Sequence, residues 1–180
     1  MPTARWRLSS STRRQFRSCE RPTTVRRLAP LAYRKAQLGR LRDLITENET
    51  AFADAVLGKI FAGRRQKMVG FETLFVLKSK VNTIIGQLDN WTRPVSRNLQ
   101  QLLDSAYIRK DPLGVVVIGA WNYPIQMTLL PLASAIAAGN AVVVKPSEIA
   151  FRTSTLVAEL IPKYMDQETV AVVQGGVNNT

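Results

Sequence analysis

The sequence of 180 residues contains no histidine and only one cysteine, Cys19. Without histidine, the chain cannot by itself supply a histidine general base, a Ser-His-Asp triad or a histidine ligand to a metal. A lone cysteine cannot close an internal disulfide or build a cysteine-rich zinc site, and such usage suits a reducing compartment. We therefore expect no bound metal and a cytoplasmic location.

Acidic residues are also scarce, since 13 Asp and Glu stand against 25 Lys and Arg and leave a formal charge of +12. The imbalance is local. Residues 1–42 hold eleven Arg, Lys35 and a single acid, Glu20, whereas residues 43–180 hold 13 bases and 12 acids. A basic stripe that would bind nucleic acid does not continue past the first segment. We expect no nucleic-acid partner.

The hydrophobic share of 46% and the charged share of 21% are ordinary for a globular protein and exclude a chain that is disordered throughout. Residues 1–30 are predicted to form a basic irregular arm, because Pro22 and Pro30 break helices and a Ser-Thr run lies between scattered arginines. An Arg-rich, acid-poor beginning is also typical of a mitochondrial transit peptide, which gives a mitochondrial location as the alternative.

Residues 31–103 are predicted to form a helical N-terminal region. Apolar residues recur at helical spacing over 31–62, with a break near Asn48, and again over 69–91. The expected core-facing residues are Leu38, Leu41, Ile45, Phe52, Val56 and Ile60 in the first stretch and Leu77, Val81, Ile84, Leu88 and Trp91 in the second. Gly63 and Pro94 are expected to end these stretches.

Residues 104–180 change pattern to short β-branched runs at 115–118, 141–144 and 170–173, separated by helical stretches at 125–138 and 151–164. Runs that are apolar throughout are typical of strands buried on both faces of a parallel sheet. The predicted fold class is α/β: N-terminal helices followed by a βαβαβ half of a doubly wound parallel sheet, truncated after its third strand.

No charged residue occurs between Asp111 and Lys145, a stretch long enough to cross a bilayer. Pro124, Pro131 and the turn signal at Asn140 interrupt it, so we expect no membrane span in this chain.

Ligands of doubly wound sheets bind outside the carboxyl ends of the strands. The run 115–118 leads directly into Trp121, Asn122, Tyr123 and Pro124. The Asn122 amide could stabilise an oxyanion, or the residue could cap the helix at 125–138, and spacing alone favours the cap. The aromatic side chains of Trp121 and Tyr123 could line a pocket, or they could pack against the core.

The second run ends at Lys145, Pro146, Ser147 and Glu148. An acid at this strand end commonly binds ribose hydroxyls, and Lys145 could bond a ribose hydroxyl or a phosphate. Helix capping by Ser147 and Glu148 is an equal alternative. The first turn lacks the G-x-G-x-x-G fingerprint of dinucleotide-binding proteins.

The order of motifs over 104–177 resembles the N-terminal part of an aldehyde dehydrogenase, most nearly the class 3, fatty aldehyde group. The motifs are Asp-Pro-Leu-Gly-Val at 111–115, Gly-Ala-Trp-Asn-Tyr-Pro at 119–124, Ala-Ala-Gly-Asn at 137–140, Lys-Pro-Ser-Glu at 145–148 and Gln-Gly-Gly at 174–176. Residues 33–103 resemble that family more loosely.

The resemblance implies oxidation of an aldehyde substrate to a carboxylic acid with NAD or NADP as cofactor, and a homodimer for a full-length form. It implies that Asn122 is the catalytic oxyanion amide, which reverses the preference for a cap. Tyr123 would line the substrate channel, Trp121 would lie near the cofactor phosphates, and Lys145 and Glu148 would contact the adenosine ribose.

The family's catalytic cysteine and general-base glutamate lie beyond this chain, and Cys19 matches neither. We therefore expect the isolated chain to be inactive, and expect the run 115–118 to leave an apolar sheet edge that promotes association. A non-catalytic nucleotide-binding or interaction module is the alternative function.

Overall fold

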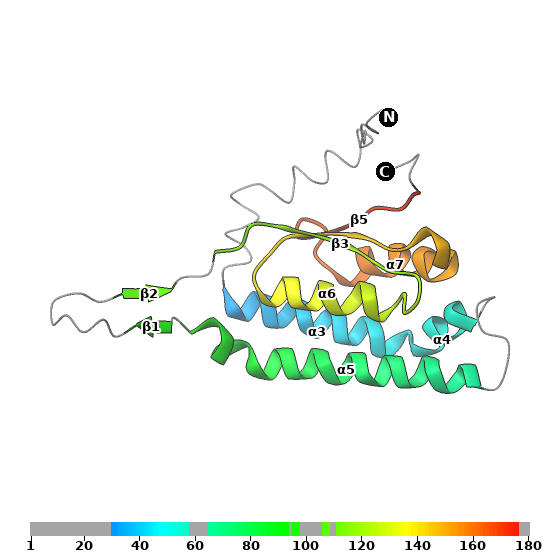
Figure 1. Ribbon diagram of the computed structural model, residues 1–180, viewed down its shortest axis with the longest axis horizontal. Coiled ribbons are helices and arrows are strands. Elements are labelled where there is room, and N and C mark those ends of the chain that lie inside the picture. Colours follow the sequence, from blue (N-terminus) through cyan, green and yellow to red (C-terminus); the bar gives the residue numbers. More distant parts are fainter. Residues whose placement is uncertain (1–29, 58–64, 94, 98–105, 109–110, 177–180) are drawn as a thin grey trace, which may run out of the picture.

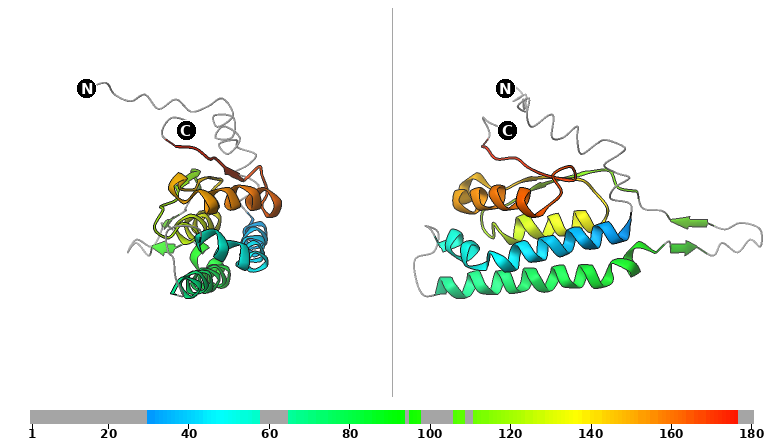
Figure 2. Two further views of the ribbon diagram at one scale, coloured as in Figure 1. Left: turned by 90° about the vertical axis from the view of Figure 1, so that its right-hand side faces the viewer. Right: turned by 180° about the vertical axis from the view of Figure 1, so that it is seen from behind.

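The computed structural model describes residues 30–57, 65–93, 95–97, 106–108 and 111–176. The expected basic arm, apart from Pro30, lies outside the described residues, as do Cys19, Ile60, Gly63 and Pro94. A layer of helices lies beneath a small sheet, and a two-stranded ribbon extends beyond the ends of the helices (Figures 1 and 2).

The helical region contains α3 (Leu31–Glu47), α4 (Glu49–Leu57) and α5 (Arg65–Thr92). The predicted break is confirmed, because α3 ends at Glu47 and the next residue, Asn48, has a non-helical conformation. The predicted stripes are confirmed as the core-facing side of these helices, with the fully buried residues Leu38, Leu41, Ile45, Phe52, Leu77 and Val81, and Leu44 is buried beside them. Trp91 is an exception at 49% exposure. It lies in the last turn of α5, where no described residue after Leu88 is buried.

The predicted strand–helix–strand pattern is confirmed. It comprises β3 (Val115–Ile118), α6 (Gln126–Ala137), β4 (Val142–Lys145), α7 (Phe151–Tyr164) and β5 (Val170–Val172). The three strands are parallel and lie in the order β3-β4-β5. Successive crossovers in one direction place both helices on the same face of the sheet, as in one half of a doubly wound fold.

The two faces of this sheet differ. Val117, Val142, Val144 and Val170 point into the main core beneath the sheet, together with buried residues of α6 and α7. On the other face, Val116 and Ile118 are 48% and 73% exposed. The prediction that every strand is buried on both faces is therefore wrong for β3, because α6 covers one face only and β3 pairs with β4 alone among the described strands.

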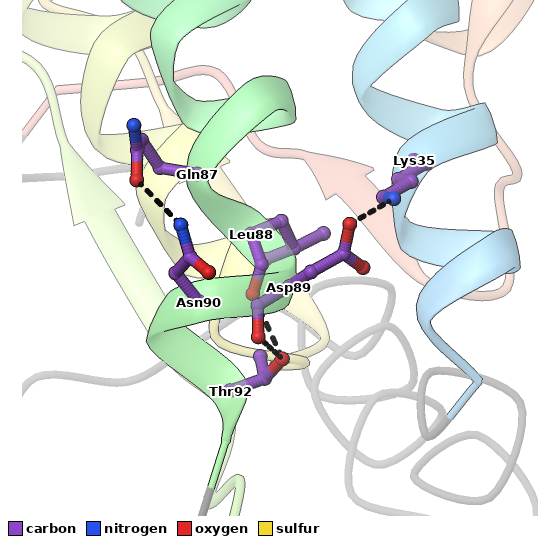
Figure 3. Close-up of polar contacts among 6 residues, drawn as sticks. All are labelled: Lys35, Gln87, Leu88, Asp89, Asn90 and Thr92. Atoms are coloured by element: carbon purple, nitrogen blue, oxygen red, sulfur yellow. Dashed lines mark hydrogen bonds and ion pairs between the residues drawn. The ribbon is translucent and has the colours of Figure 1, made fainter.

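Polar contacts hold the far end of α5 against α3 (Figure 3). Lys35 on α3 and Asp89 on α5 form an ion pair at 2.7 Å. The Thr92 hydroxyl donates to the Leu88 carbonyl at 2.8 Å and so satisfies an oxygen in the last turn of the helix.

After α5 the chain forms an antiparallel pair, β1 (Val95–Arg97) with β2 (Ala106–Ile108). The sequence did not indicate these strands, because three residues are too few for an alternating pattern. They lie on either side of the boundary expected between residues 103 and 104. Within the described ranges, no helix is long and apolar enough to cross a membrane.

Candidate functional site at the carboxyl ends of the strands

The carboxyl ends of the three parallel strands meet at one edge of the sheet. The strand register pairs Ile118 with Lys145 and Val144 with Val172. The Gly119 amide donates to the Lys145 carbonyl at 2.9 Å, and the Val173 amide donates to the Val144 carbonyl at 2.8 Å. The segments that follow the strands therefore begin side by side, at the edge where doubly wound sheets bind ligands.

The segment after β3 presents Trp121, Asn122 and Tyr123 to solvent, with Trp121 53% exposed and Tyr123 49% exposed. Helix α6 begins at Gln126, and its N-cap position is Ile125, which provides no side-chain cap. The interpretation of Asn122 as a helix cap is therefore wrong, because this residue precedes the cap position by three residues.

The Asn122 side chain makes no hydrogen bond within the part of the chain that the structure describes. An exposed amide of this kind is available to a ligand, and its N–H groups can donate to an oxygen that acquires negative charge. This is the arrangement that an oxyanion-stabilising role requires of the free protein.

The segment after β4 carries an ion pair between Lys145 and Glu148 at 2.9 Å, in which the Glu148 side chain is 46% exposed and the Lys145 side chain 17% exposed. The hydrogen bond from Lys145 is the main cause that lowers the pKa of Glu148 below its ordinary value, followed by a backbone hydrogen bond and the lysine charge. Glu148 is therefore a carboxylate at neutral pH, with oxygen lone pairs that can accept hydrogen bonds from a ligand.

Capping at this strand end is confirmed for Ser147. Its hydroxyl accepts from the Ile149 amide at 3.3 Å at the start of the short 3-10 helix η1 (Glu148–Ala150). Glu148 lies in the first turn of η1. The capping and binding interpretations of this segment are compatible, because the capping atom belongs to Ser147 and the Glu148 carboxylate remains exposed.

The segment after β5 lies beside Glu148. A Cβ atom added to Gly176 would lie 3.9 Å from Cγ of Glu148. The side-chain amide of Gln174 donates to the Ser154 hydroxyl on α7 at 3.3 Å and anchors this segment. The segment after β5 therefore lies within van der Waals distance of the Glu148 side chain.

Together these residues fit the ribose of a nucleotide better than a metal. Lys145 offers donors and Glu148 offers acceptors, the complementary pair for ribose hydroxyls. Among the described residues, no group of three or more His, Cys, Asp and Glu side chains could hold a metal ion. No hydrogen bond or ion pair joins Asn122 to Lys145 or Glu148 in the described ranges, so the two groups share an edge but form separate parts of it.

Sequence reasoning missed Thr128 and its contact with Gly119, which shape this edge. A Cβ atom on Gly119 would lie 2.3 Å from Oγ1 of Thr128, and the Thr128 hydroxyl donates to the Pro124 carbonyl at 2.6 Å. The only signal in the sequence is a Thr four residues after Pro124, a spacing too common to single it out.

Known proteins are similar to this chain in sequence and in fold. A sequence profile described as the aldehyde dehydrogenase family matches residues 12–180. Aldehyde dehydrogenase family 3 member A2 of Pongo abelii is 39% identical over 157 residues, which are 86% of this chain and 32% of that protein. The dimeric, NADP-preferring aldehyde dehydrogenase of Rattus norvegicus is 40% identical over 153 residues, 83% of this chain and 33% of that protein.

Among solved structures, the substrate-bound state of Staphylococcus aureus AldH superposes with a TM-score of 0.82 at 28% identity, over 92% of this chain and 36% of that one. The chain thus spans about a third of the length of the curated relatives that it matches.

Proposed function

The chain belongs to the aldehyde dehydrogenase family, and we propose that it forms the part of such an enzyme that binds the adenosine end of the cofactor and supplies the oxyanion amide. The reaction is the oxidation of an aldehyde to a carboxylic acid. The observation that carries the proposal is the shared strand edge, at which an unbonded Asn122 amide and the Lys145–Glu148 pair follow neighbouring strands.

The cofactor is NAD or NADP, as the family assignment implies, and its nicotinamide accepts hydride when it is bound. Glu148 accepts hydrogen bonds from the ribose hydroxyls, and Lys145 donates to one of them while holding Glu148 in its charged form. Asn122 donates to the substrate oxygen as negative charge develops there. Tyr123 lines the substrate channel, and Trp121 lies near the cofactor phosphates.

We propose that the 180-residue chain, tested alone, has no dehydrogenase turnover, because the family's reaction needs a cysteine nucleophile and the one cysteine of this chain, Cys19, matches no catalytic position of the family. The rat relative is named dimeric, and a homodimer is the proposed assembly of an active form. The cytoplasm is the proposed location.

A non-catalytic nucleotide-binding module is the second candidate, because the Lys145–Glu148 pair can bind ribose whether or not a nucleophile is present. Titration of NAD and NADP into the chain, with Trp6 and Trp91 replaced by Phe so that emission reports Trp121, tests binding. A parallel assay for NADH or NADPH formation from a fatty aldehyde tests turnover.

We expect a saturable change in Trp121 emission that Glu148→Ala weakens and Asn122→Ala does not. Absence of any saturable response to either cofactor would contradict both candidates. Binding without turnover fits the proposal for the isolated chain, and turnover by the purified chain would refute the expected inactivity.

A further inference from the structure

Thr128 contacts both ends of the segment that carries Asn122. It lies on α6 and is fully buried. Its hydroxyl donates to the Pro124 carbonyl at 2.6 Å, and its Oγ1 occupies the space into which a Cβ of Gly119 would project, 2.3 Å away. We propose that Thr128 is a positioning residue that determines where the Asn122 amide lies, an inference whose catalytic meaning rests on the proposed function.

The backbone at the start of α6 explains why a side chain is needed here. The Thr128 amide donates to the Ile125 carbonyl at 3.2 Å, a contact of the tighter i to i+3 kind. The Pro124 carbonyl therefore accepts from the Thr128 hydroxyl four residues along the chain. A buried hydroxyl that satisfies a turn carbonyl fixes both groups, because breaking the bond would leave each without a partner.

The other anchors of the segment lie on either side of Asn122. The Gly119 amide donates to the Lys145 carbonyl at 2.9 Å, and the Met127 amide donates to the Tyr123 carbonyl at 2.8 Å. Ile125 is buried in the core. Between these anchors Asn122 projects without a bond of its own, so its position follows from the distance between the two ends, and Thr128 is the side chain that touches both.

Gly119 and Thr128 form a matched pair. Without Oγ1 of Thr128, the nearest atoms to a Cβ on Gly119 would be Cβ of Thr128 at 3.4 Å and Cα of Pro146 at 3.5 Å. Both distances are ordinary van der Waals contacts. Removal of the hydroxyl should therefore make room for the methyl group of Gly119→Ala, which allows the contact to be tested by a pair of substitutions.

The first experiment compares Thr128→Val, which keeps the shape and removes the hydroxyl, with Thr128→Ser, which keeps the hydroxyl. The observable is the pair of side-chain amide signals of Asn122 in nitrogen-15 NMR spectra of the 180-residue chain without cofactor, assigned by their loss in Asn122→Asp. We expect Thr128→Val to shift or broaden these signals and the Trp121 indole signal. We expect Thr128→Ser to leave both sets of signals as they are in the unmodified chain. Unchanged signals in Thr128→Val, or a Thr128→Ser spectrum that matches Thr128→Val, would overturn the proposal.

The second experiment covers the case in which Thr128→Val does not fold. Gly119→Ala and Thr128→Ala should each displace the Asn122 signals, and the double variant Gly119→Ala/Thr128→Ala should displace them by less than the sum of the two, because the methyl group then occupies the space that Oγ1 leaves. A displacement in the double variant that equals or exceeds the sum of the two single displacements overturns the proposal. Both experiments omit the cofactor, so a wild-type chain that fails to bind NAD or NADP would refute the proposed function and leave this result intact.

Discussion

The two ends of the small parallel sheet use polar side chains in opposite ways. At the amino end, the Tyr33 hydroxyl donates to the Asp166 carboxylate at 2.5 Å and lies 3.3 Å from the Thr169 hydroxyl. The buried Gln37 side chain accepts from the Asp166 amide at 3.2 Å. These contacts join α3 to the turn before β5. The polar side chains named here therefore form hydrogen bonds with other groups of the protein.

At the carboxyl end, Asn122 has no hydrogen bond within the described ranges, and Glu148 has an exposed side chain held by Lys145. Polar groups that are buried away from water need hydrogen-bond partners within the protein, whereas exposed polar groups can bond to water or to a ligand. The difference separates residues that stabilise the sheet from residues available for binding, although Asn, Tyr and acidic residues occur at both ends. Substitutions at the two ends should therefore have different effects.

The largest effect concerns the two asparagines. In a form of the protein that turns over aldehydes, Asn122→Ala should lower kcat by about 10²–10³-fold, or about 2.7–4 kcal/mol, because an oxyanion donor is lost. Steady-state kinetics and cofactor titration measure it, and cofactor affinity should be retained.

The matched control is Asn140→Ala at the amino end. The Asn140 side chain accepts from the Leu113 and Gly114 amides at 2.9 and 3.1 Å. Its loss should lower the unfolding temperature without lowering kcat. Equal kcat values for Asn122→Ala and the unmodified enzyme would contradict the role assigned to Asn122.

The next effect compares two tyrosines. Tyr33→Phe removes a hydrogen bond to the Asp166 carboxylate and should lower the free energy of unfolding by about 1.5–3 kcal/mol, the usual range for bonds to charged groups. Tyr123→Phe at the carboxyl end should change it by no more than about 0.5 kcal/mol, as for most surface substitutions. Denaturant titration of the chain measures both. A larger loss for Tyr123→Phe than for Tyr33→Phe would reverse the assignment of the two ends.

A smaller effect concerns the exposed face and edge of β3. Ile118 is 73% exposed on a strand that pairs with β4 alone among the described strands. We predict that the chain associates as its concentration rises and that Ile118→Lys reduces this association, because a charge discourages edge-to-edge pairing. Sedimentation velocity measures the species present.

Phe75→Lys provides the control, because Phe75 is 62% exposed but lies on α5, away from any strand edge. It should leave association unchanged. A monodisperse wild-type monomer at all concentrations would refute the edge argument.

The smallest effect is the titration of Glu148. Its folded-state pKa is lowered, so the ion pair with Lys145 is present above the ordinary value of 4.5 and is lost only as the pH falls through the lower folded-state pKa. Lys145→Met should raise the pKa of Glu148 toward 4.5, because the hydrogen bond that lowers this pKa most is removed. The carboxyl carbon-13 shift of Glu148, followed against pH, measures this change. A pKa that is the same in both forms would show that Lys145 does not hold the carboxylate.

Much of the fold follows from local patterns. The break at Asn48, the three β-branched runs and the two helices between them lie where spacing and composition predict them. The β1–β2 pair could not be predicted, because its three-residue strands depend on pairing between segments and leave no periodic signal. The exposure of Trp91 and of the outer face of β3 also escaped prediction, because burial depends on which elements happen to cover a residue.

The sequence alone indicated the order of the helices and of the three parallel strands, and the set of candidate residues, because periodicity, β-branching and motif order are local properties. The tertiary structure was needed to show which hydrogen bonds the polar atoms of each candidate residue make. It showed that Asn122 precedes the cap position of α6, that the Ser147 hydroxyl accepts from the Ile149 amide while Glu148 lies in the first turn of η1, and that Thr128 reaches both Gly119 and Pro124. Hydrogen-bond satisfaction depends on atoms brought together from distant segments, and no local pattern records it.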